Sequence, residues 1–172
     1  MSESSKTPVN GGKPLVAILT GSPNDLPVVE KAQDVLSSLG IVSELLVMSA
    51  HRTPERVREY VQAAPGRGIE VFIACAGMAN HLAGAVAAQT LLPVIGVPLA
   101  SGAMGGLDAL MSTVQMPPGI PVATVAVDGT KNAAYLAARM LATRFEEITA
   151  RLTADLKAQH KNYDMPDKPR VR

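Results

Sequence analysis

The sequence predicts a doubly wound α/β fold of the three-layer α/β/α type, with a parallel sheet of about five strands covered by helices on both faces. Uncharged runs rich in Val, Ile and Leu alternate along the chain with segments whose apolar residues recur at helical spacing. The strand-like runs are apolar throughout, as strands buried between two helical layers are. The length of 172 residues fits one domain of ordinary size.

The first half of the chain is expected to contain three strands and two helices. Residues 14–20 form a continuous apolar run that is typical of a buried parallel strand. Apolar side chains at helical spacing predict a helix over residues 26–40, which should stop at Gly40. A second strand is expected at residues 41–48. Thr53 can then cap a helix over residues 54–64, and a third strand follows at residues 69–76.

The second half continues the alternation. Residues 81–89 form a helix of small side chains, and residues 93–97 form a fourth strand. A flexible glycine-rich loop at residues 101–106 precedes a short helix at 107–114, and a fifth strand is expected at 122–127. Residues 132–157 form one long helix or two. We therefore expect one catalytic α/β domain at residues 14–157, a mobile N-terminal tail at 1–13 and a C-terminal tail at 158–172.

Composition excludes several classes of function. The net charge is +1 and aromatic residues make up only 3% of the chain, so neither a nucleic-acid surface nor base stacking is expected. A single cysteine, Cys75, allows no intrachain disulfide and no Cys-rich zinc site, and it suits a cytoplasmic location. Residues 71–107 contain no charged side chain, but polar residues and prolines interrupt them, so we expect burial against other subunits rather than in a membrane.

The loops after the first three strands should meet at one edge of the sheet, where ligands bind in such folds. In the first loop, Ser22 and Asn24 can donate hydrogen bonds at a helix N-terminus that favours anions. Asp25 can accept sugar hydroxyls or cap the helix. In the second loop, from Ser49 to Pro54, His51 can transfer a proton and Arg52 can bind phosphate, although a plain surface loop is the alternative.

The third loop is a run of mostly small residues in which Gly77 permits close approach to a ligand. His81 could be a second acid or base, but its apolar neighbours favour a core histidine. Two histidines and one cysteine without a nearby carboxylate predict no metal site. A Ser–His–Asp hydrolase also ranks low because the chain has no nucleophile elbow. The third-loop candidates are Gly77, Met78, Ala79, Asn80, His81 and Leu82.

Five motifs in order closely resemble the PurE family over about residues 15–141. The family is that of the N5-carboxyaminoimidazole ribonucleotide mutases. The motifs are Gly21-Ser22-x-x-Asp25, Ser49-Ala50-His51-Arg52-Thr53-Pro54, Ala76-Gly77-x-Ala79-x-His81-Leu82-x-Gly84, Pro93-Val94-x-Gly96-Val97-Pro98 and Gln115-Met116-Pro117-x-Gly119-x-Pro121-Val122.

This resemblance implies a flavodoxin-like subunit in a homo-octamer that acts in purine biosynthesis without a metal or an organic cofactor. It implies that a carboxylate moves from N5 to C4 of an imidazole ribonucleotide, with His51 first as acid and then as base. Ser22, Asp25 and Arg52 would bind phosphate and ribose, and residues 77–81 would enclose the CO2. Residues 101–106, which are glycine-rich and uncharged, are themselves expected to form a lid or a wall of the pocket.

Four residues depart from the usual family pattern, namely Asn24, Met78, Asn80 and Ala83. The second class of the family carboxylates aminoimidazole ribonucleotide with free CO2 and carries Ser-Asn in the third loop. In this chain, Asn80 matches the Asn of that pair. The intact Ser-Ala-His-Arg-Thr-Pro motif favours the mutase. Direct carboxylation and a non-catalytic flavodoxin-like nucleotide-binding module are the alternatives.

Overall fold

The computed structural model describes residues 7–161 and contains one parallel sheet in the strand order β2-β1-β3-β4-β5. This is the order of flavodoxin-like folds, so the predicted fold class is confirmed. All five expected strands are present. Their bounds are β1 Val16–Thr20, β2 Ser43–Val47, β3 Val71–Gly77, β4 Val94–Leu99 and β5 Ala123–Thr124.

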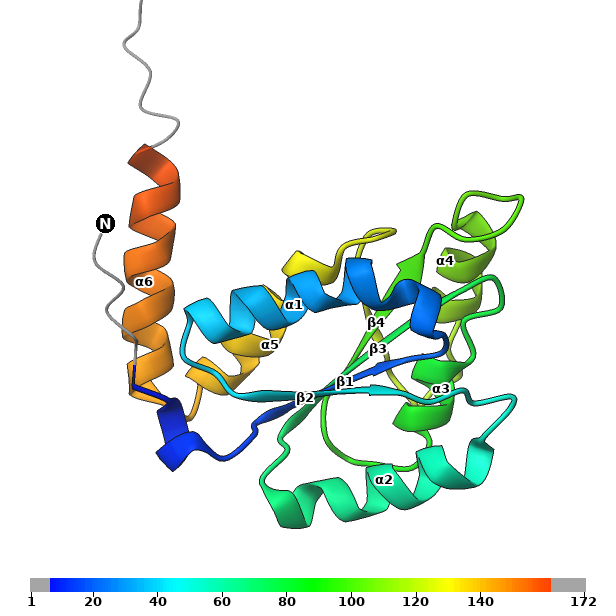
Figure 1. Cartoon of the computed structure of the whole chain (residues 1–172), viewed down its shortest axis with the longest axis horizontal. Helices are drawn as coiled ribbons and strands as arrows, with labels where there is room; N and C mark the ends of the chain where they lie inside the picture. The colour runs from blue at the N-terminus through cyan, green and yellow to red at the C-terminus, as the bar shows by residue number, and fades with distance from the viewer. Residues whose placement is uncertain (1–6, 162–172) are drawn as a thin grey trace, which may run out of the picture.

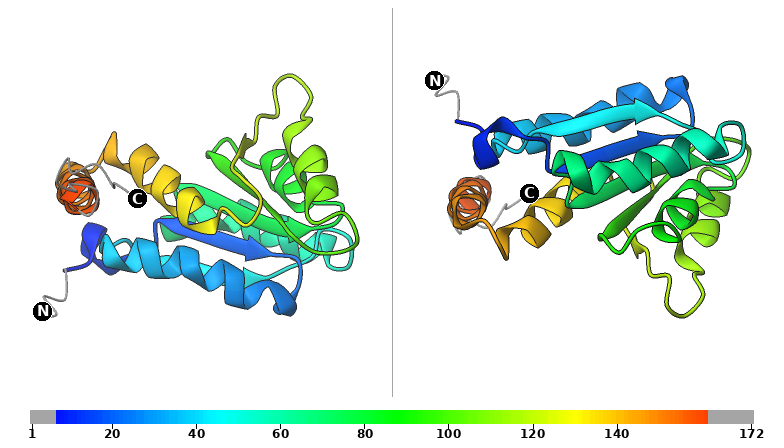
Figure 2. Two further views of the ribbon diagram at one scale, coloured as in Figure 1. Left: turned by 90° about the horizontal axis from the view of Figure 1, so that it is seen from above. Right: turned by 90° about the horizontal axis from the view of Figure 1, so that it is seen from below.

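Helices cover both faces of the sheet (Figures 1 and 2). Helices α1 (Leu26–Ser38) and α5 (Thr130–Ala142) pack against each other on one face. The other face carries α2 (Pro54–Arg67), α3 (Leu82–Ala87) and α4 (Leu107–Val114). Helix α6 (Glu146–Lys161) packs on α5 and lies at the end of the molecule opposite the carboxyl ends of the strands (Figure 1). Two short 3-10 helices complete the fold, Val9–Gly12 and Pro23–Asp25.

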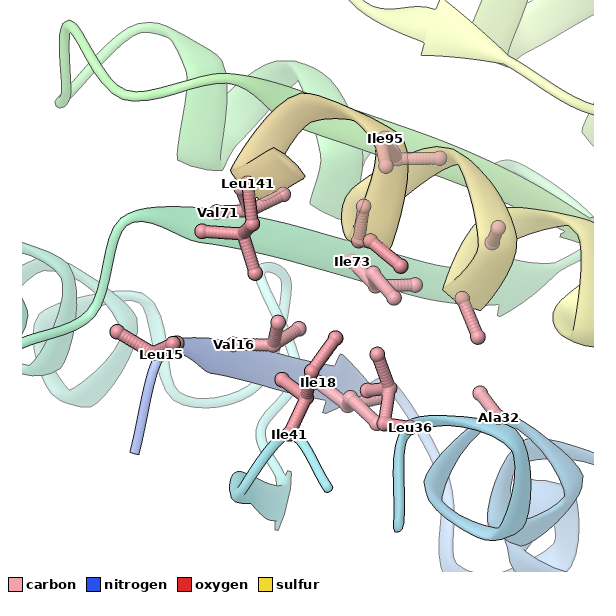
Figure 3. Close-up of a cluster of buried hydrophobic side chains, with 14 of the residues drawn as sticks. Leu15, Val16, Ile18, Ala32, Leu36, Ile41, Val71, Ile73, Ile95 and Leu141 are labelled. Carbon is pink, nitrogen blue, oxygen red and sulfur yellow. The ribbon is translucent and has the colours of Figure 1, made fainter. Parts of the chain in front are cut away.

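The period of two along each strand divides the core into two layers. In β1, Val16 and Ile18 face α1 and α5, whereas Ala17 and Leu19 face α2 and α3. Figure 3 shows the first layer, where Leu141 of α5 lies beside Val71 of β3 and Leu36 of α1 lies beside Ile18 of β1. Both faces of β1 are fully buried, which explains why its sequence is apolar throughout rather than alternating.

Several elements differ from the sequence prediction in extent. Helix α2 continues through Pro65 to Arg67, and Gly68 caps it in the left-handed conformation (φ 107°). The expected fifth strand has only two paired residues, although the N–H of Val125 still donates to the carbonyl of Gly96 in β4 at 3.2 Å. Residues 132–157, expected to form one long helix or two, belong to two helices separated by residues 143–145.

Parts of both predicted tails are ordered. Val9 is buried, and its N–H donates to the carbonyl of Gly40 at 2.9 Å, so the predicted mobile segment docks on the domain from this point. Residues 158–161 belong to α6. Residues 1–6 and 162–172 of the two predicted tails lie outside the described residues. In the described part of the chain, no helix is both long and apolar enough to cross a membrane.

Candidate active site

A pocket of about 450 Å³ lies at the carboxyl edge of the sheet, where the loops after β1, β2 and β3 meet. Its volume falls within the roughly 300–1,000 Å³ of small-molecule sites. Ser101, from the loop after β4, closes one side. Of the predicted site residues, the pocket is lined by Ser22, Asn24, Asp25, Ser49, His51, Arg52, Gly77, Met78, Ala79 and Leu82.

The first loop presents a carboxylate beside a helix N-terminus. Ser22 accepts the N–H of Asn24 at its hydroxyl (3.2 Å) and so begins the short 3-10 helix that leads into α1. Asp25 makes no capping hydrogen bond to α1; instead its Oδ2 accepts the hydroxyl of Thr20 at 3.2 Å. The Asp25 side chain therefore stays at the pocket, and it does not serve as the helix cap that the sequence also allowed.

Two opposing effects act on Asp25. Burial raises the pKa of its carboxyl above the ordinary value of 3.8, and the negative charge of Asp128 raises it further. The hydrogen bond from Thr20 lowers the same pKa, but burial dominates. Asp25 is thus a carboxylate whose ionisation is made costly by its burial. Hydroxyl donors from a ligand would relieve that cost.

The second loop is a compact turn closed by Ser49 and Thr53. The Thr53 hydroxyl donates to the carbonyl of Ser49 at 3.1 Å and accepts the N–H of Ser49 at 3.1 Å. The Ser49 hydroxyl accepts the N–H of Arg52 at 3.2 Å. The predicted cap at Thr53 is therefore used to close the turn, and its side chain makes no capping bond to α2. This turn holds His51 and Arg52 exposed at its tip.

The two histidines of the site form a pair. Nε2 of His51 lies 2.9 Å from Nδ1 of His81, and the rings meet edge to face with centroids 5.0 Å apart. One nitrogen of this contact must carry a proton and the other must accept it, so the hydrogen bond requires at least one neutral ring. His81 does not line the pocket, but it contacts the ring of His51, which does.

The expectation of a core histidine at position 81 is wrong, because His81 is exposed and Asn80 is the residue that enters the core. The backbone at Met78 adopts a left-handed conformation (φ 55°), after which Asn80 points inward. The Asn80 amide nitrogen donates to Oγ1 of Thr113 at 2.8 Å and to the carbonyl of Val97 at 3.3 Å. Asn80 therefore anchors the third loop to α4 and β4 and does not line the pocket.

Gly77 lies where an added side chain would collide with the loop after β4. A Cβ at this position would lie 1.5 Å from Oγ of Ser101 and 3.2 Å from the carbonyl oxygen of Leu99. The third loop and the loop after β4 are therefore in van der Waals contact across Gly77. Within residues 7–161, no three His, Cys, Asp or Glu side chains lie close enough together to hold a metal ion.

Sequence reasoning did not identify Asp128 as part of this edge of the sheet. Its Oδ1 accepts the N–H of Ala100 at 2.9 Å, next to the pocket residue Ser101. The Asp-Gly pair at positions 128 and 129 predicts a turn, but that signal does not show that the turn after β5 reaches the loop after β4. Their contact depends on the order of the strands in the sheet.

Known proteins match this chain over most of its length. The AIR carboxylase (AIRC) family model matches residues 15–162. The N5-carboxyaminoimidazole ribonucleotide mutase of Pyrococcus horikoshii is 55% identical over 145 residues, which are 84% of this chain and 82% of that protein. The mutase of Mycobacterium tuberculosis strain H37Rv is 50% identical over 144 residues, which are 84% of this chain and 83% of that protein.

A solved structure agrees with both fold and sequence. The crystal structure of Treponema denticola PurE superimposes with a TM-score of 0.80 and 32% identity, covering 87% of this chain and 94% of that one. Family model, curated relatives and solved structure thus agree with one another over most of the chain. The chain belongs to the AIR carboxylase family, as its resemblance to PurE proteins predicted.

Proposed function

We propose that the chain converts N5-carboxyaminoimidazole ribonucleotide to 4-carboxy-5-aminoimidazole ribonucleotide, a step of purine biosynthesis. The relatives that carry the name mutase support this reaction. The observation that carries it is the convergence of three loops in one pocket, where a histidine, an arginine and a carboxylate face a wall of small residues.

The first two loops suit the phosphate and the ribose of such a substrate. Arg52 is exposed at the pocket and can form two parallel hydrogen bonds to a phosphate. The N-terminal end of the Pro23–Asp25 helix and α1 favours an anion, and Ser22 and Asn24 add neutral polar groups. The Asp25 carboxylate can accept hydrogen bonds from two ribose hydroxyls.

His51 is assigned the proton transfers. The His51 imidazolium donates its proton to N5, the bond between N5 and the carboxyl carbon breaks, and CO2 and aminoimidazole ribonucleotide result. C4 then attacks the CO2 and forms a new carbon–carbon bond, and the neutral His51 ring removes the proton from C4. The cycle returns His51 to its starting protonation state. An imidazole ring can both donate and accept a proton, which suits a group that must be acid and base in turn.

The third loop is assigned to the CO2 between the two steps. Gly77 and Ala79 offer small surfaces there, Leu82 is buried at the base, and Ser101 closes the wall. Such a wall limits water and keeps a small neutral molecule next to the carbon that attacks it. Asn80, which resembles the CO2-using class, acts here through the position of the loop, because its side chain is fully buried away from the pocket.

A paired labelling assay tests this function. The purified protein is given the substrate with a ¹³C-labelled N5 carboxyl group in unlabelled bicarbonate buffer, and separately aminoimidazole ribonucleotide with labelled bicarbonate. We expect the label to be retained at the C4 carboxyl and the first reaction to be the faster. Faster carboxylation of aminoimidazole ribonucleotide from bicarbonate would assign the chain to the direct carboxylases. Tight binding without turnover of either substrate would assign a nucleotide-binding module.

The proposed enzyme is a homo-octamer. One face of helix α4, continued by the loop before it, exposes large apolar side chains that are each about half exposed in the single chain: Met104 of the loop and Leu107, Met111 and Val114 of the helix. A second copy of the chain would cover this face. Sedimentation should give eight subunits, and a monomer would contradict the proposal. The proposed location is the cytoplasm, where reducing conditions suit the free, buried Cys75.

A further inference from the structure

The loop of residues 100–106, between β4 and α4, is closed at its base against the turn after β5. Gly106 has φ 91°, and a Cβ there would lie 2.6 Å from Cγ1 of Val127 and 3.2 Å from Cα of Ala100. The two ends of the loop therefore touch each other as well as Val127. Surface loops of this length whose ends lie close together are Ω-loops, which frequently carry function.

Asp128 fastens that base with both its side chain and its backbone. Oδ1 of Asp128 accepts the N–H of Ala100, and the N–H of Asp128 donates to the carbonyl of Pro98, each at 2.9 Å. Asp128 has φ 55°, a left-handed conformation that Asp and Asn adopt more readily than most residues. The residue type thus fits both the backbone conformation and the hydrogen bond at this position.

From the fastened base, the loop lies against the third loop of the pocket. Ser101 approaches Gly77 so closely that a Cβ there would lie 1.5 Å from its hydroxyl oxygen. A Cβ on Gly102 would lie 3.3 Å from Cγ of Met78. Ser101 lines the pocket directly after the residue that Asp128 holds. A change at Asp128 is thus transmitted to the pocket wall through a single peptide unit.

We propose that Asp128 is a positioning residue, which holds the loop of residues 100–106 so that Ser101 closes the pocket over Gly77. Asp128 reaches the pocket only through Ala100 and Ser101 and does not line it. Only the kinetic test of this inference rests on the proposed function. The order of the loop can be measured without any turnover.

Two substitutions separate the hydrogen bond from the charge. Asp128→Gly keeps the left-handed backbone and removes the acceptor, whereas Asp128→Asn keeps an acceptor oxygen and removes the charge. Asn10→Gly is the matched control, because Asn10 also has a positive φ (56°) but lies in the N-terminal 3-10 helix. Each variant is measured by amide hydrogen exchange across residues 99–107 and by steady-state kinetics of the proposed reaction.

In Asp128→Gly, we expect exchange at the Ala100 amide to rise about tenfold, the low end of the effect of a hydrogen bond to a charged group. The kcat should fall about tenfold as well, because Ser101 then no longer closes the wall assigned to the CO2, and the KM should change by less than about threefold. Asp128→Asn should keep both values within about threefold of the parent protein, since it still accepts from Ala100. Asn10→Gly should change neither.

Unchanged exchange at Ala100 in Asp128→Gly would overturn the inference, whatever the kinetics. Equal losses in Asp128→Asn and Asp128→Gly would overturn it too, because the charge rather than the hydrogen bond would then be the cause. If the parent protein does not turn over the proposed substrate, the proposed function fails. The exchange measurement still decides whether Asp128 orders the loop.

Discussion

The contact between Gly77 and Ser101 predicts that a single added methyl group, in Gly77→Ala, lowers both stability and activity. In Gly77→Ala, the added methyl carbon would meet Oγ of Ser101 at 1.5 Å and Cβ of Ser101 at 2.7 Å. Rotation of Ser101 relieves only the first contact. The carbonyl oxygen of Leu99 lies 3.2 Å from the same point and belongs to the neighbouring strand β4, so it cannot move away freely.

The cost can be worked out from this geometry. Overpacking of a fixed site costs about 1–3 kcal/mol, and the reduced entropy of the unfolded chain returns about 0.4–1 kcal/mol for a Gly→Ala change. We therefore expect a net loss of about 1–2 kcal/mol in the free energy of unfolding, or about 2–8 °C in Tm for a chain of this length. Displacement of Ser101 from the pocket should also lower kcat/KM by about tenfold or more.

Gly21→Ala is the matched control, since Gly21 lines the same pocket at the end of the neighbouring strand. A Cβ at Gly21 meets only Cβ of Ala76 at 3.7 Å, an ordinary van der Waals contact. The Tm of both variants is compared with that of the parent at equal protein concentration, because subunit association shifts Tm. A Tm of Gly77→Ala equal to that of Gly21→Ala would refute the claim that the Gly77–Ser101 contact is rigid.

Three further changes test other parts of the structure. Asp25→Asn should raise the free energy of unfolding at pH 7 and lower activity. Burial raises the folded-state pKa of Asp25, so ionisation of this carboxyl destabilises the folded protein above that pKa. Urea titrations should show that the stability gained by the variant vanishes as the pH falls below 3.8, and a gain that stays constant with pH would contradict this. Met111→Lys should reduce the subunit number in sedimentation, because it charges the exposed face of α4, and an unchanged octamer would contradict that interface. Tyr60→Phe should cost about 1 kcal/mol in urea unfolding, since it removes the hydrogen bond to the half-buried Glu44, and kcat should stay unchanged because this pair lies outside the pocket.

The fold could be predicted from the sequence because its strands are buried on both faces. The run at residues 14–20 has no polar face, and it requires neighbours on both sides and helices above and below. That arrangement places the loops after Thr20, Val47 and Gly77 at one edge, whichever residues they contain. The pocket location thus follows from topology alone.

The orientation of side chains within the third loop could not be predicted in the same way. The apolar residues around His81 indicate a buried loop, but they do not determine which of two adjacent polar residues is buried. The left-handed turn at Met78 decides this, and a non-glycine residue gives no signal of such a turn. Asn80 is buried because Thr113 and Val97, distant in sequence, supply its hydrogen-bond partners.

The role of His51 is tested most directly by the turnover of His51→Asn, with nucleotide affinity measured by calorimetry on the same sample. Loss of general acid and base catalysis should lower kcat by about 10²–10⁴-fold. The Kd for the nucleotide should stay within about threefold, since phosphate and ribose are assigned to Arg52 and Asp25. A kcat within about tenfold of the parent protein, with affinity retained, would contradict the assignment of His51 as the group that transfers the proton.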